Sequence, residues 1–511
     1  MPRSLTAKLI GPPLLWFLLS AATFPSATSA ADLTGRWLNE ETVPDGNTTQ
    51  IVIVFQQTGS HLGGKIIFSW GELRISNGST DGKTFKFDLM TPADDKNPAK
   101  YEGTIQGDEL QVISHWPGNN NTAYTAKRTS NTMGDPPARI ALPALHPVPY
   151  NGLAATPPMG WNSWNHFEGR VSDAVVREIA DAMASNGMRD AGYIYINIDD
   201  TWEGKRDAAG NIQSNNKFPD MKALADYVHG KGMKLGIYSS PGPKTCGGYE
   251  GSYGHEQQDA KTYAQWGIDY LKYDWCSAGR IYRNEDLRAV YQKMGDALQA
   301  TGRPIVYSLC EYGMDDPWKW GPSVGANLWR TTGDITDHWS ALDYTGFAQN
   351  DLAPYAAPGH WNDPDMLEVG NGGMTDDEYR AHMSLWALLA APLLAGNDIR
   401  TMSAATREIL LNPEVVAVDQ DPAGHQAKRI SKQGDLEVWA RPLSDGFQAV
   451  GLFNRSAATA QVTVRWSDLG LSGTQDVRDL WTHKTTASVR DGYSQLVPIH
   501  GVVFLKIVPV K

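Results

Sequence analysis

The chain has 511 residues and a formal net charge of −12, with 20% charged and 41% hydrophobic residues. This composition is ordinary for a soluble globular protein, and the length predicts two to four domains. The acidic balance argues against nucleic acid and anionic membranes as partners, because both require a basic face on the protein. The 18 tryptophans and 20 tyrosines, against 12 phenylalanines, exceed what core filling needs and suit the binding of sugar rings.

Residues 1–30 are predicted to be a secretory signal peptide. Arg3 and Lys8 precede an apolar run at 14–24, and small residues at 26–30 offer a cleavage site. The run is too short to span a bilayer, with an uncleaved anchor as the alternative. We therefore expect a secreted or periplasmic protein. In such a compartment, three cysteines predict one disulfide and one free thiol.

Residues 31–130 predict a small all-β domain, either a barrel or a sandwich. Short β-prone runs between glycine-rich turns are typical of such domains. The runs are 51–55, 65–68, 85–87 and 110–113. The domain is a candidate carbohydrate-binding module with Trp70 or Trp116 as platforms. A spacer or oligomerisation role, with both tryptophans buried, is the alternative. The proline density of residues 131–155 then predicts a semi-rigid linker.

From 156 to 424, strand and helix patterns alternate. The predicted helices are 173–186, 221–231, 256–266 and 287–300, and the predicted strands are 193–198, 234–238, 270–273 and 304–309. Repeated βα units of this kind predict a (β/α)₈ TIM barrel. A doubly wound sheet is disfavoured, because the sequence has no glycine-rich phosphate loop and polar residues end nearly every strand. Residues 425–511 predict an antiparallel β-sandwich.

Several predicted barrel strands end in aspartates. Asp199 and Asp200 follow one strand, Asp274 follows another, and Asp334 follows a third. Barrel enzymes place their chemistry at these strand ends, and two carboxyls there suit the nucleophile and the acid/base of a retaining glycosidase. Helix N-capping is the alternative role. Lys272 lies two positions before Asp274, so it shares a strand face with Asp274 and favours its ionised form, unless the two form a structural ion pair.

A series of motifs in this region resembles glycoside hydrolase family 27, the α-galactosidase and α-N-acetylgalactosaminidase family of clan D. The opening motif is Pro-Pro-Met-Gly-Trp-Asn-Ser-Trp-Asn at 157–165. The others, in chain order, are 198–200, 236–238, 244–246, 271–274, 310–311, 330–335, 361–366, 391–393 and 412–424. The resemblance covers about 155–425, and the C-terminal sandwich more weakly.

The resemblance implies a role for each matching residue. Asp274 aligns with the nucleophile and Asp334 with the acid/base of a double displacement with retention. The implied substrate-binding residues are Asp199 and Asp200 at the 4- and 6-hydroxyls, Lys272 and Arg330 at the 3- and 2-hydroxyls, and Trp164, Tyr238 and Asp365 elsewhere in the pocket. Cys246 and Cys276 align with a family disulfide beside the nucleophile.

Specificity is expected to rest on few positions. Glu311 can bond the 2-hydroxyl, whereas relatives that accept N-acetylgalactosamine carry smaller residues there. The retained Asp199 and Asp200 favour galactose over β-L-arabinopyranose. Two departures from the family pattern, Trp275 and Tyr312, bear on the aglycone preference.

The expected function is therefore an exo-acting retaining α-galactosidase whose partner is a galactose-containing oligo- or polysaccharide. An α-N-acetylgalactosaminidase and a β-L-arabinopyranosidase are the alternatives among enzymes. A catalytically silent carbohydrate-binding protein is a further alternative, disfavoured by the intact Asp274, Asp334 and Lys272. No metal or organic cofactor is expected, because the histidines are scattered and neither HExxH nor paired-cysteine spacing occurs.

Overall fold

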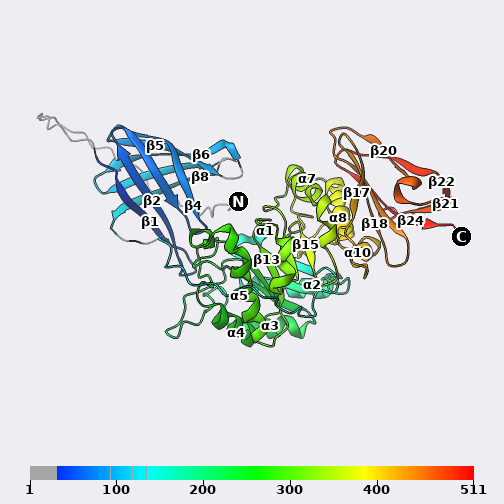
Figure 1. Ribbon diagram of the computed structural model, residues 1–511, viewed down its shortest axis with the longest axis horizontal. Helices are drawn as coiled ribbons and strands as arrows, with labels where there is room; N and C mark the ends of the chain where they lie inside the picture. Colours follow the sequence, from blue (N-terminus) through cyan, green and yellow to red (C-terminus); the bar gives the residue numbers. More distant parts are fainter. Residues whose placement is uncertain (1–30, 92–93, 117–119, 131, 133–134, 511) are drawn as a thin grey trace, which may run out of the picture. The chain divides into compact units, whose positions relative to one another are not determined.

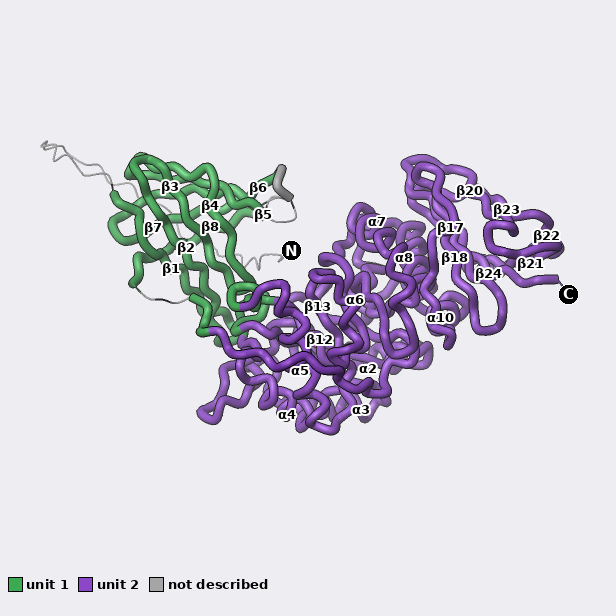
Figure 2. The backbone as a smooth tube through the Cα atoms, viewed as in Figure 1, with its two compact units in different colours: residues 1–138, 243–249, 276–281 green, residues 139–242, 250–275, 282–511 purple. Residues whose placement is uncertain are grey.

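The computed structural model describes residues 31–510 apart from 92–93, 117–119, 131 and 133–134, so the predicted signal peptide lies outside the described residues. The chain forms two compact units (Figure 2). Unit 1 contains the N-terminal segment up to residue 138 together with two short segments, 243–249 and 276–281. Unit 2 contains the remainder.

Unit 1 is built around a closed barrel of eight antiparallel strands, each paired with the next in sequence, and β1 pairs with β8 to close it. The strands are β1 (Gly35–Thr42), β2 (Thr48–Thr58), β3 (His61–Ile67), β4 (Glu72–Thr80), β5 (Thr84–Thr91), β6 (Asp94–Gln106), β7 (Glu109–Trp116) and β8 (Asn120–Thr129). Alternate side chains point inward, so large apolar residues such as Trp37, Phe55 and Phe87 fill the interior. The all-β prediction is confirmed, and the fold is a barrel rather than a sandwich.

Unit 2 begins with the predicted (β/α)₈ barrel, which is confirmed. Eight parallel strands pair in the order β15-β14-β13-β12-β11-β10-β9-β16. They are β9 (Met159–Asn162), β10 (Tyr195–Asn197), β11 (Lys234–Ser239), β12 (Tyr270–Asp274), β13 (Val306–Cys310), β14 (Leu328–Arg330), β15 (Trp361–Asp363) and β16 (Leu393–Ala395). A parallel bridge between Leu367 and Ala395 joins the chain after β15 to β16 and completes the ring.

Helices of unit 2 cover the barrel strands (Figure 1). They are α1 (Trp164–Phe167), α2 (Asp173–Asn186), α3 (Met221–Gly230), α4 (Glu256–Trp266), α5 (Leu287–Ala300), α6 (Pro317–Trp320), α7 (Trp339–Phe347), α8 (Asp376–Leu389), α9 (Ala404–Leu411) and α10 (Pro413–Asp419). Short 3₁₀ turns are η1 (Glu168–Arg170), η2 (Ala278–Arg280), η3 (Asn284–Asp286), η4 (Gly321–Val324), η5 (Ala348–Tyr355) and η6 (Trp466–Leu469), of which η2 belongs to unit 1.

Local sequence signals account for the ends of these helices. The side chain of Ser172 accepts a hydrogen bond from Val175 N at the start of α2, and Thr375 and Glu378 form a capping box at the start of α8. Gly187 and Gly267 stop α2 and α4 in the left-handed conformation, with φ of 95° and 86°. The predicted bounds of α2, α4 and α5 match the structure, and α3 ends one residue earlier than predicted.

The C-terminal part of unit 2 is the predicted β-sandwich. A six-stranded sheet has the order β17-β18-β19-β24-β21-β22, and β20 pairs with β23. The strands are β17 (Lys428–Gln433), β18 (Leu436–Pro442), β19 (Gln448–Asn454), β20 (Ala460–Arg465), β21 (Thr474–Asp479), β22 (Thr485–Arg490), β23 (Gly492–Val497) and β24 (Val502–Pro509). Helix α8 packs on β19 and β24. Arg455 pairs with Asp343 of α7 and with the buried Glu437.

Within the described residues, no helix has the length and apolar character needed to cross a membrane.

Candidate active site

The carboxyl ends of the barrel strands bring the predicted polar side chains together. Neighbouring strands place Asp274 opposite Cys310 and Arg330 opposite Asp363 in register. Because side chains alternate along a strand, Lys272 and Asp274 of β12 lie on the same face. The carboxyl end is where TIM barrels carry their catalytic groups, so this cluster is the candidate active site.

Asp274 is buried at the end of β12, with 6% of its surface exposed. Its Oδ2 accepts a hydrogen bond from the Tyr238 hydroxyl at 2.9 Å, and its Oδ1 accepts one from the Tyr312 hydroxyl at 2.6 Å. Burial raises the pKa of this carboxyl, the nearby Lys272 lowers it, and the charge of Asp334 raises it again. The carboxylate is therefore held in one orientation and close to other charges.

Lys272 connects two carboxylates of the cluster. Its Nζ lies 2.8 Å from Asp199 Oδ2, which also accepts a hydrogen bond of 2.8 Å from Asn162 Nδ2. Although burial lowers the pKa of Lys272, the charges of Asp199 and Asp274 help to hold it well above its ordinary value. Lys272 is therefore a fixed cation that forms an ion pair with Asp199 and favours the ionised form of Asp274.

Arg330 forms a second charged link at the end of β14. Its Nη2 lies 3.1 Å from Asp334 Oδ1 and 3.0 Å from Asp365 Oδ2, and the latter oxygen also accepts from Ile335 N. Burial raises the pKa of Asp365, Arg330 opposes the rise, and the charges of Asp334 and Asp363 add to it. Asp334 is the open member of this group, with 37% of its side chain exposed.

Other residues predicted to bind substrate lie at the ends of β9 and β10. Asp200 is buried, and its Oδ1 accepts a hydrogen bond from Thr201 N at 2.6 Å. Trp164 begins α1 directly after β9 and is half-buried, and its backbone N donates to Asn162 Oδ1. Strands β9 and β10 are neighbours in the barrel, and β11 separates β10 from β12, which carries Lys272.

Glu311 is placed differently from the prediction. Both of its carboxyl oxygens are closed to solvent and have no hydrogen-bond partner among the described residues. Burial raises the pKa of Glu311 well above its ordinary value, so its neutral form is favoured. An ionised Glu311 would raise the pKa of Tyr291 of α5 and the pKa of Tyr307. A carboxyl sealed in this way does not face a substrate, so the predicted bond from Glu311 to the 2-hydroxyl is corrected.

Cys310 takes the inward position beside Glu311. Its Sγ accepts a hydrogen bond from Arg330 Nη1 at 3.6 Å, and the thiol is free and buried. From the sequence, Cys310 is expected to be the free thiol and to belong to the family motif at 310–311, without a role in the site. The signal that could have revealed it is strand alternation, because Ser308 and Cys310 on β13 pair with Lys272 and Asp274 on β12.

Comparison with known proteins places the chain in a family. Residues 156–421 match the family model described as alpha galactosidase A, and residues 433–507 match the alpha galactosidase C-terminal beta sandwich domain. The chain belongs to glycoside hydrolase family 27, the α-galactosidase family. The family predicted from the sequence motifs is therefore confirmed.

The similarity of this family 27 chain to individual relatives extends over most of their length. An α-galactosidase of Cyamopsis tetragonoloba is 53% identical over 365 residues, which cover 70% of this chain and 88% of the relative. The crystal structure of α-galactosidase I from Mortierella vinacea has a TM-score of 0.67 and 40% identity. The matched region covers 70% of this chain and 98% of the Mortierella chain. A Bacteroides fragilis structure, with a TM-score of 0.68 and 34% identity, covers 93% of this chain and 92% of its own.

Two positions at which this family 27 chain departs from the family pattern differ in their placement. The Trp275 indole is 8% exposed and stacks on Tyr291 of α5, with ring centroids 5.9 Å apart and planes at 28°. It therefore packs behind the barrel wall. Tyr312, in contrast, reaches Asp274 directly. Of these two departures, Tyr312 is the one that contacts the candidate catalytic carboxyl.

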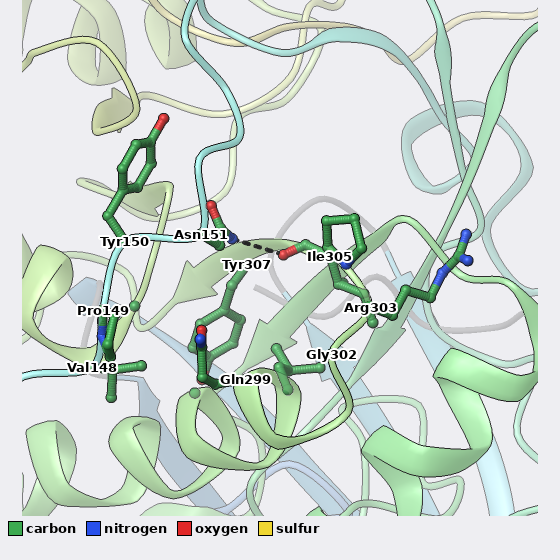
Figure 3. Close-up of a pocket in the computed structure, with 13 residues that line it drawn as sticks. Val148, Pro149, Tyr150, Asn151, Gln299, Gly302, Arg303, Ile305 and Tyr307 are labelled. Atoms are coloured by element: carbon green, nitrogen blue, oxygen red, sulfur yellow. Dashed lines mark hydrogen bonds between the residues drawn. The ribbon is translucent and has the colours of Figure 1, made fainter.

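A separate pocket of about 210 Å³ lies at the amino ends of β13 and β14 (Figure 3). It is lined by the proline-rich segment at 148–151 and by α5, and Asn151 Nδ2 donates to Ile305 O across 3.0 Å at its edge. The amino ends of barrel strands serve stability rather than catalysis, so this pocket is not the active site.

Proposed function

We propose that this family 27 protein is a retaining α-galactosidase that removes terminal α-D-galactosyl residues from oligo- and polysaccharides. The observation that supports this best is the pairing of a buried carboxyl with an open one. Asp274 is held by two phenolic hydroxyls beside Lys272, and the more exposed Asp334 is held by Arg330. A nucleophile must be ionised and fixed, whereas an acid/base must reach the leaving oxygen.

The proposed reaction has two steps. Asp274 attacks the anomeric carbon while Asp334 donates its proton to the leaving glycosidic oxygen, which forms a galactosyl ester on Asp274 and frees the aglycone. Asp334 then takes a proton from water, the resulting hydroxide attacks the anomeric carbon, and Asp274 leaves as a carboxylate. Two inversions give galactose with retained configuration.

The charges of the site support the change in role of Asp334. Burial raises the pKa of Asp334, but Arg330 and Lys272 hold it below its ordinary value, and the charge of an ionised Asp274 opposes that lowering. When Asp274 becomes an uncharged ester, this repulsion disappears and the pKa of Asp334 falls. The proton affinity of Asp334 is therefore higher in the first step, where it acts as the acid, than in the second, where it acts as the base.

Sugar recognition is assigned to the remaining residues of the cluster. We infer that Asp199 and Asp200 bind the 4- and 6-hydroxyls, and that Lys272 and Arg330 bind the region of the 3- and 2-hydroxyls. Trp164, Tyr238 and Asp365 complete the pocket. Since Glu311 is sealed away from the site, Cys310 beside Arg330 takes over the contact near the 2-position.

Two further features support a reaction outside the cytosol. We infer from the sequence of residues 1–30 that the enzyme is secreted or periplasmic, where galactose-containing polymers and oligosaccharides are accessible. The disulfide between Cys246 and Cys276 fits such an oxidising compartment.

The test is hydrolysis of aryl α-D-galactopyranoside beside the α-N-acetylgalactosaminide and β-L-arabinopyranoside analogues. Wild type should prefer the galactoside, and Asp274→Ala should lose at least about 10⁴-fold in kcat. Azide should restore turnover of Asp274→Ala with formation of the β-galactosyl azide, because a small anion replaces the missing nucleophile. Asp226→Ala, which removes an exposed carboxylate of α3, is the control and should match wild type. An active Asp274→Ala without azide would refute the assignment.

A further inference from the structure

The two short segments of unit 1 outside the N-terminal barrel are loops that border the catalytic strands in sequence. The segment 243–249 follows β11, and the segment 276–281 follows β12 (Figure 2). A disulfide between Cys246 and Cys276 joins them. Cys276 is only two residues after Asp274, so the position of this disulfide-linked loop pair bears on the proposed nucleophile through the covalent chain.

Both loops are hydrogen-bonded to the turn between β3 and β4, residues 68–71, which we call the bracing turn. Ser69 Oγ donates to the carbonyl of Cys246 at 2.9 Å. The carbonyl of Trp70 accepts from Ser277 N at 2.9 Å. One turn of the N-terminal barrel therefore holds each of the two loops that the disulfide connects.

The loop after β11 also packs closely against the barrel. Gly248 has φ of +91°, and a Cβ atom at that position would lie 3.2 Å from the Cβ of Ser69 and 3.7 Å from a methyl carbon of Thr49. The Tyr249 hydroxyl donates to Asp45 Oδ2 at 2.6 Å. Glycine at 248 allows this approach because its backbone tolerates the left-handed conformation and it has no side chain.

The loop after β12 is held by hydrogen bonds to the loop after β11. Ser277 has φ of +54°, in the left-handed region that a serine rarely adopts. Its hydroxyl accepts from Lys244 N at 3.0 Å and donates to Lys244 O at 2.7 Å. The backbone of Ser277 is thus fixed by the other loop through its side chain and by Trp70 through its N–H group.

Aromatic packing makes the bracing turn itself rigid. The rings of Phe68 and Trp70 are stacked, with centroids 5.1 Å apart and planes at 3°, and Trp116 meets Phe68 edge-on at 5.9 Å. Stacked and edge-on contacts of this kind stabilise a packed cluster. Trp70 and Trp116 are both half-buried in this cluster, which favours a structural role over the sugar platform considered from the sequence.

We propose that the bracing turn is a positioning element for the catalytic centre. It holds the disulfide-linked loops so that the end of β12 presents Asp274 in a productive orientation. The proposal rests on the proposed role of Asp274 as nucleophile. The N-terminal barrel then contributes to turnover through the two loops that it holds. A displacement of the order of 1 Å at a reacting group lowers catalysis strongly, so small losses of support are measurable as changes in kcat.

The test compares two matched serine variants. Ser69→Ala removes the hydrogen bond to Cys246 O. Ser76→Ala removes a bond of the same kind, from a serine hydroxyl to the carbonyl of Asp88, elsewhere in the same barrel. We expect Ser69→Ala to lower kcat for an aryl α-galactoside by roughly three- to tenfold with KM within about twofold, because positioning acts on the transition state. Ser76→Ala should keep wild-type kcat.

A second readout reports on the loops themselves. In the native enzyme, dithiothreitol should reduce the disulfide of Ser69→Ala several times faster than that of wild type or Ser76→Ala, because freed loops expose it more often. Tyr249→Phe, which removes the bond to Asp45, should change kcat and reduction rate in the same directions and serves if Ser69→Ala folds poorly.

The outcomes separate this proposal from the proposed function. Wild-type kcat in both Ser69→Ala and Tyr249→Phe, with an inactive Asp274→Ala, would overturn the positioning role alone. A fully active Asp274→Ala would overturn the nucleophile assignment and the positioning role that rests on it. A fall in kcat that is equal in Ser69→Ala and Ser76→Ala would show a general effect of barrel stability and would also overturn the proposal.

Discussion

The Tyr312 hydroxyl donates a hydrogen bond to Oδ1 of Asp274 at 2.6 Å, and Tyr238 occupies the other oxygen at 2.9 Å. Tyr312 adopts φ of +58°, a left-handed conformation that costs a non-glycine residue of order 1–3 kcal/mol. The surrounding structure therefore maintains this contact against local strain. Charge-assisted hydrogen bonds to both oxygens favour the carboxylate form of the proposed nucleophile over its protonated form.

Removal of the Tyr312 hydroxyl should destabilise the ionised form of Asp274. The hydrogen bond lowers the pKa of Asp274, so Tyr312→Phe should raise that pKa. The acidic limb of the kcat/KM profile should then move to higher pH by about one unit, since a bond to a charged group is worth roughly 1.5–3 kcal/mol and part of it is replaced by water. Tyr344→Phe, at a 70% exposed tyrosine, is the control and should leave the limb unchanged. A limb that stays in place in Tyr312→Phe would contradict this account.

Lys272→Met should affect both carboxylates that the lysine pairs with. Loss of the cation removes the effect that lowers the pKa of Asp274, so the acidic limb should again shift upward. The buried Asp199 is left without its ion pair, so kcat/KM should fall by at least about 100-fold. The pH dependence of aryl galactoside hydrolysis measures both effects. Lys222→Met, at an exposed lysine of α3, should behave as wild type.

Glu368 should make the stability of the protein depend on pH. Burial raises the pKa of this carboxyl to about 7 from 4.5, against hydrogen bonds from Asn371 and Asn165. The folded state therefore binds the proton more tightly than the unfolded state does. The free energy of unfolding should fall as pH rises from about 4.5 to about 7, by at most about 3 kcal/mol.

Glu368→Gln should flatten this slope in urea unfolding measured between pH 5 and 8. The control is Glu285→Gln, at an exposed carboxylate, which should retain the wild-type slope. An unchanged slope in Glu368→Gln would show that other groups cause the pH dependence.

Two glycines of unit 2 should respond oppositely to alanine. A Cβ at Gly160 on β9 would lie 2.2 Å from the carbonyl oxygen of Tyr195, so Gly160→Ala forces two barrel strands apart and should destabilise the fold by several kcal/mol. Gly230 ends α3 with nothing within 4 Å of a built Cβ, so Gly230→Ala should be neutral or stabilising by up to about 1 kcal/mol. Thermal unfolding of both variants measures the difference, and equal midpoints would contradict it.

Some elements were predictable because their signals are local. The ends of α2, α4 and α5 follow from capping residues and amphipathic spacing, which act within a few positions of each other. Strands of the N-terminal barrel with strong apolar runs were found, but β1, β4, β6 and β8 were not. β4, for example, reads Glu-Leu-Arg-Ile-Ser-Asn-Gly-Ser-Thr, and only three of its nine residues are buried, so its pairing partners decide that it is a strand.

The sequence by itself determined the family, the barrel order and the aspartates at the strand ends, because these depend on motifs and on residue types adjacent in the chain. The tertiary structure alone decided which neighbouring side chain faces the site. Glu311 and Cys310 differ by one position, and strand alternation turns one outward and the other inward. The tertiary structure also brings the Tyr312 hydroxyl into contact with Asp274. It brings residues 68–71 into contact with loops some 170 to 210 positions later in the chain. Contacts of that separation depend on packing across the whole fold and leave no periodic trace in the sequence.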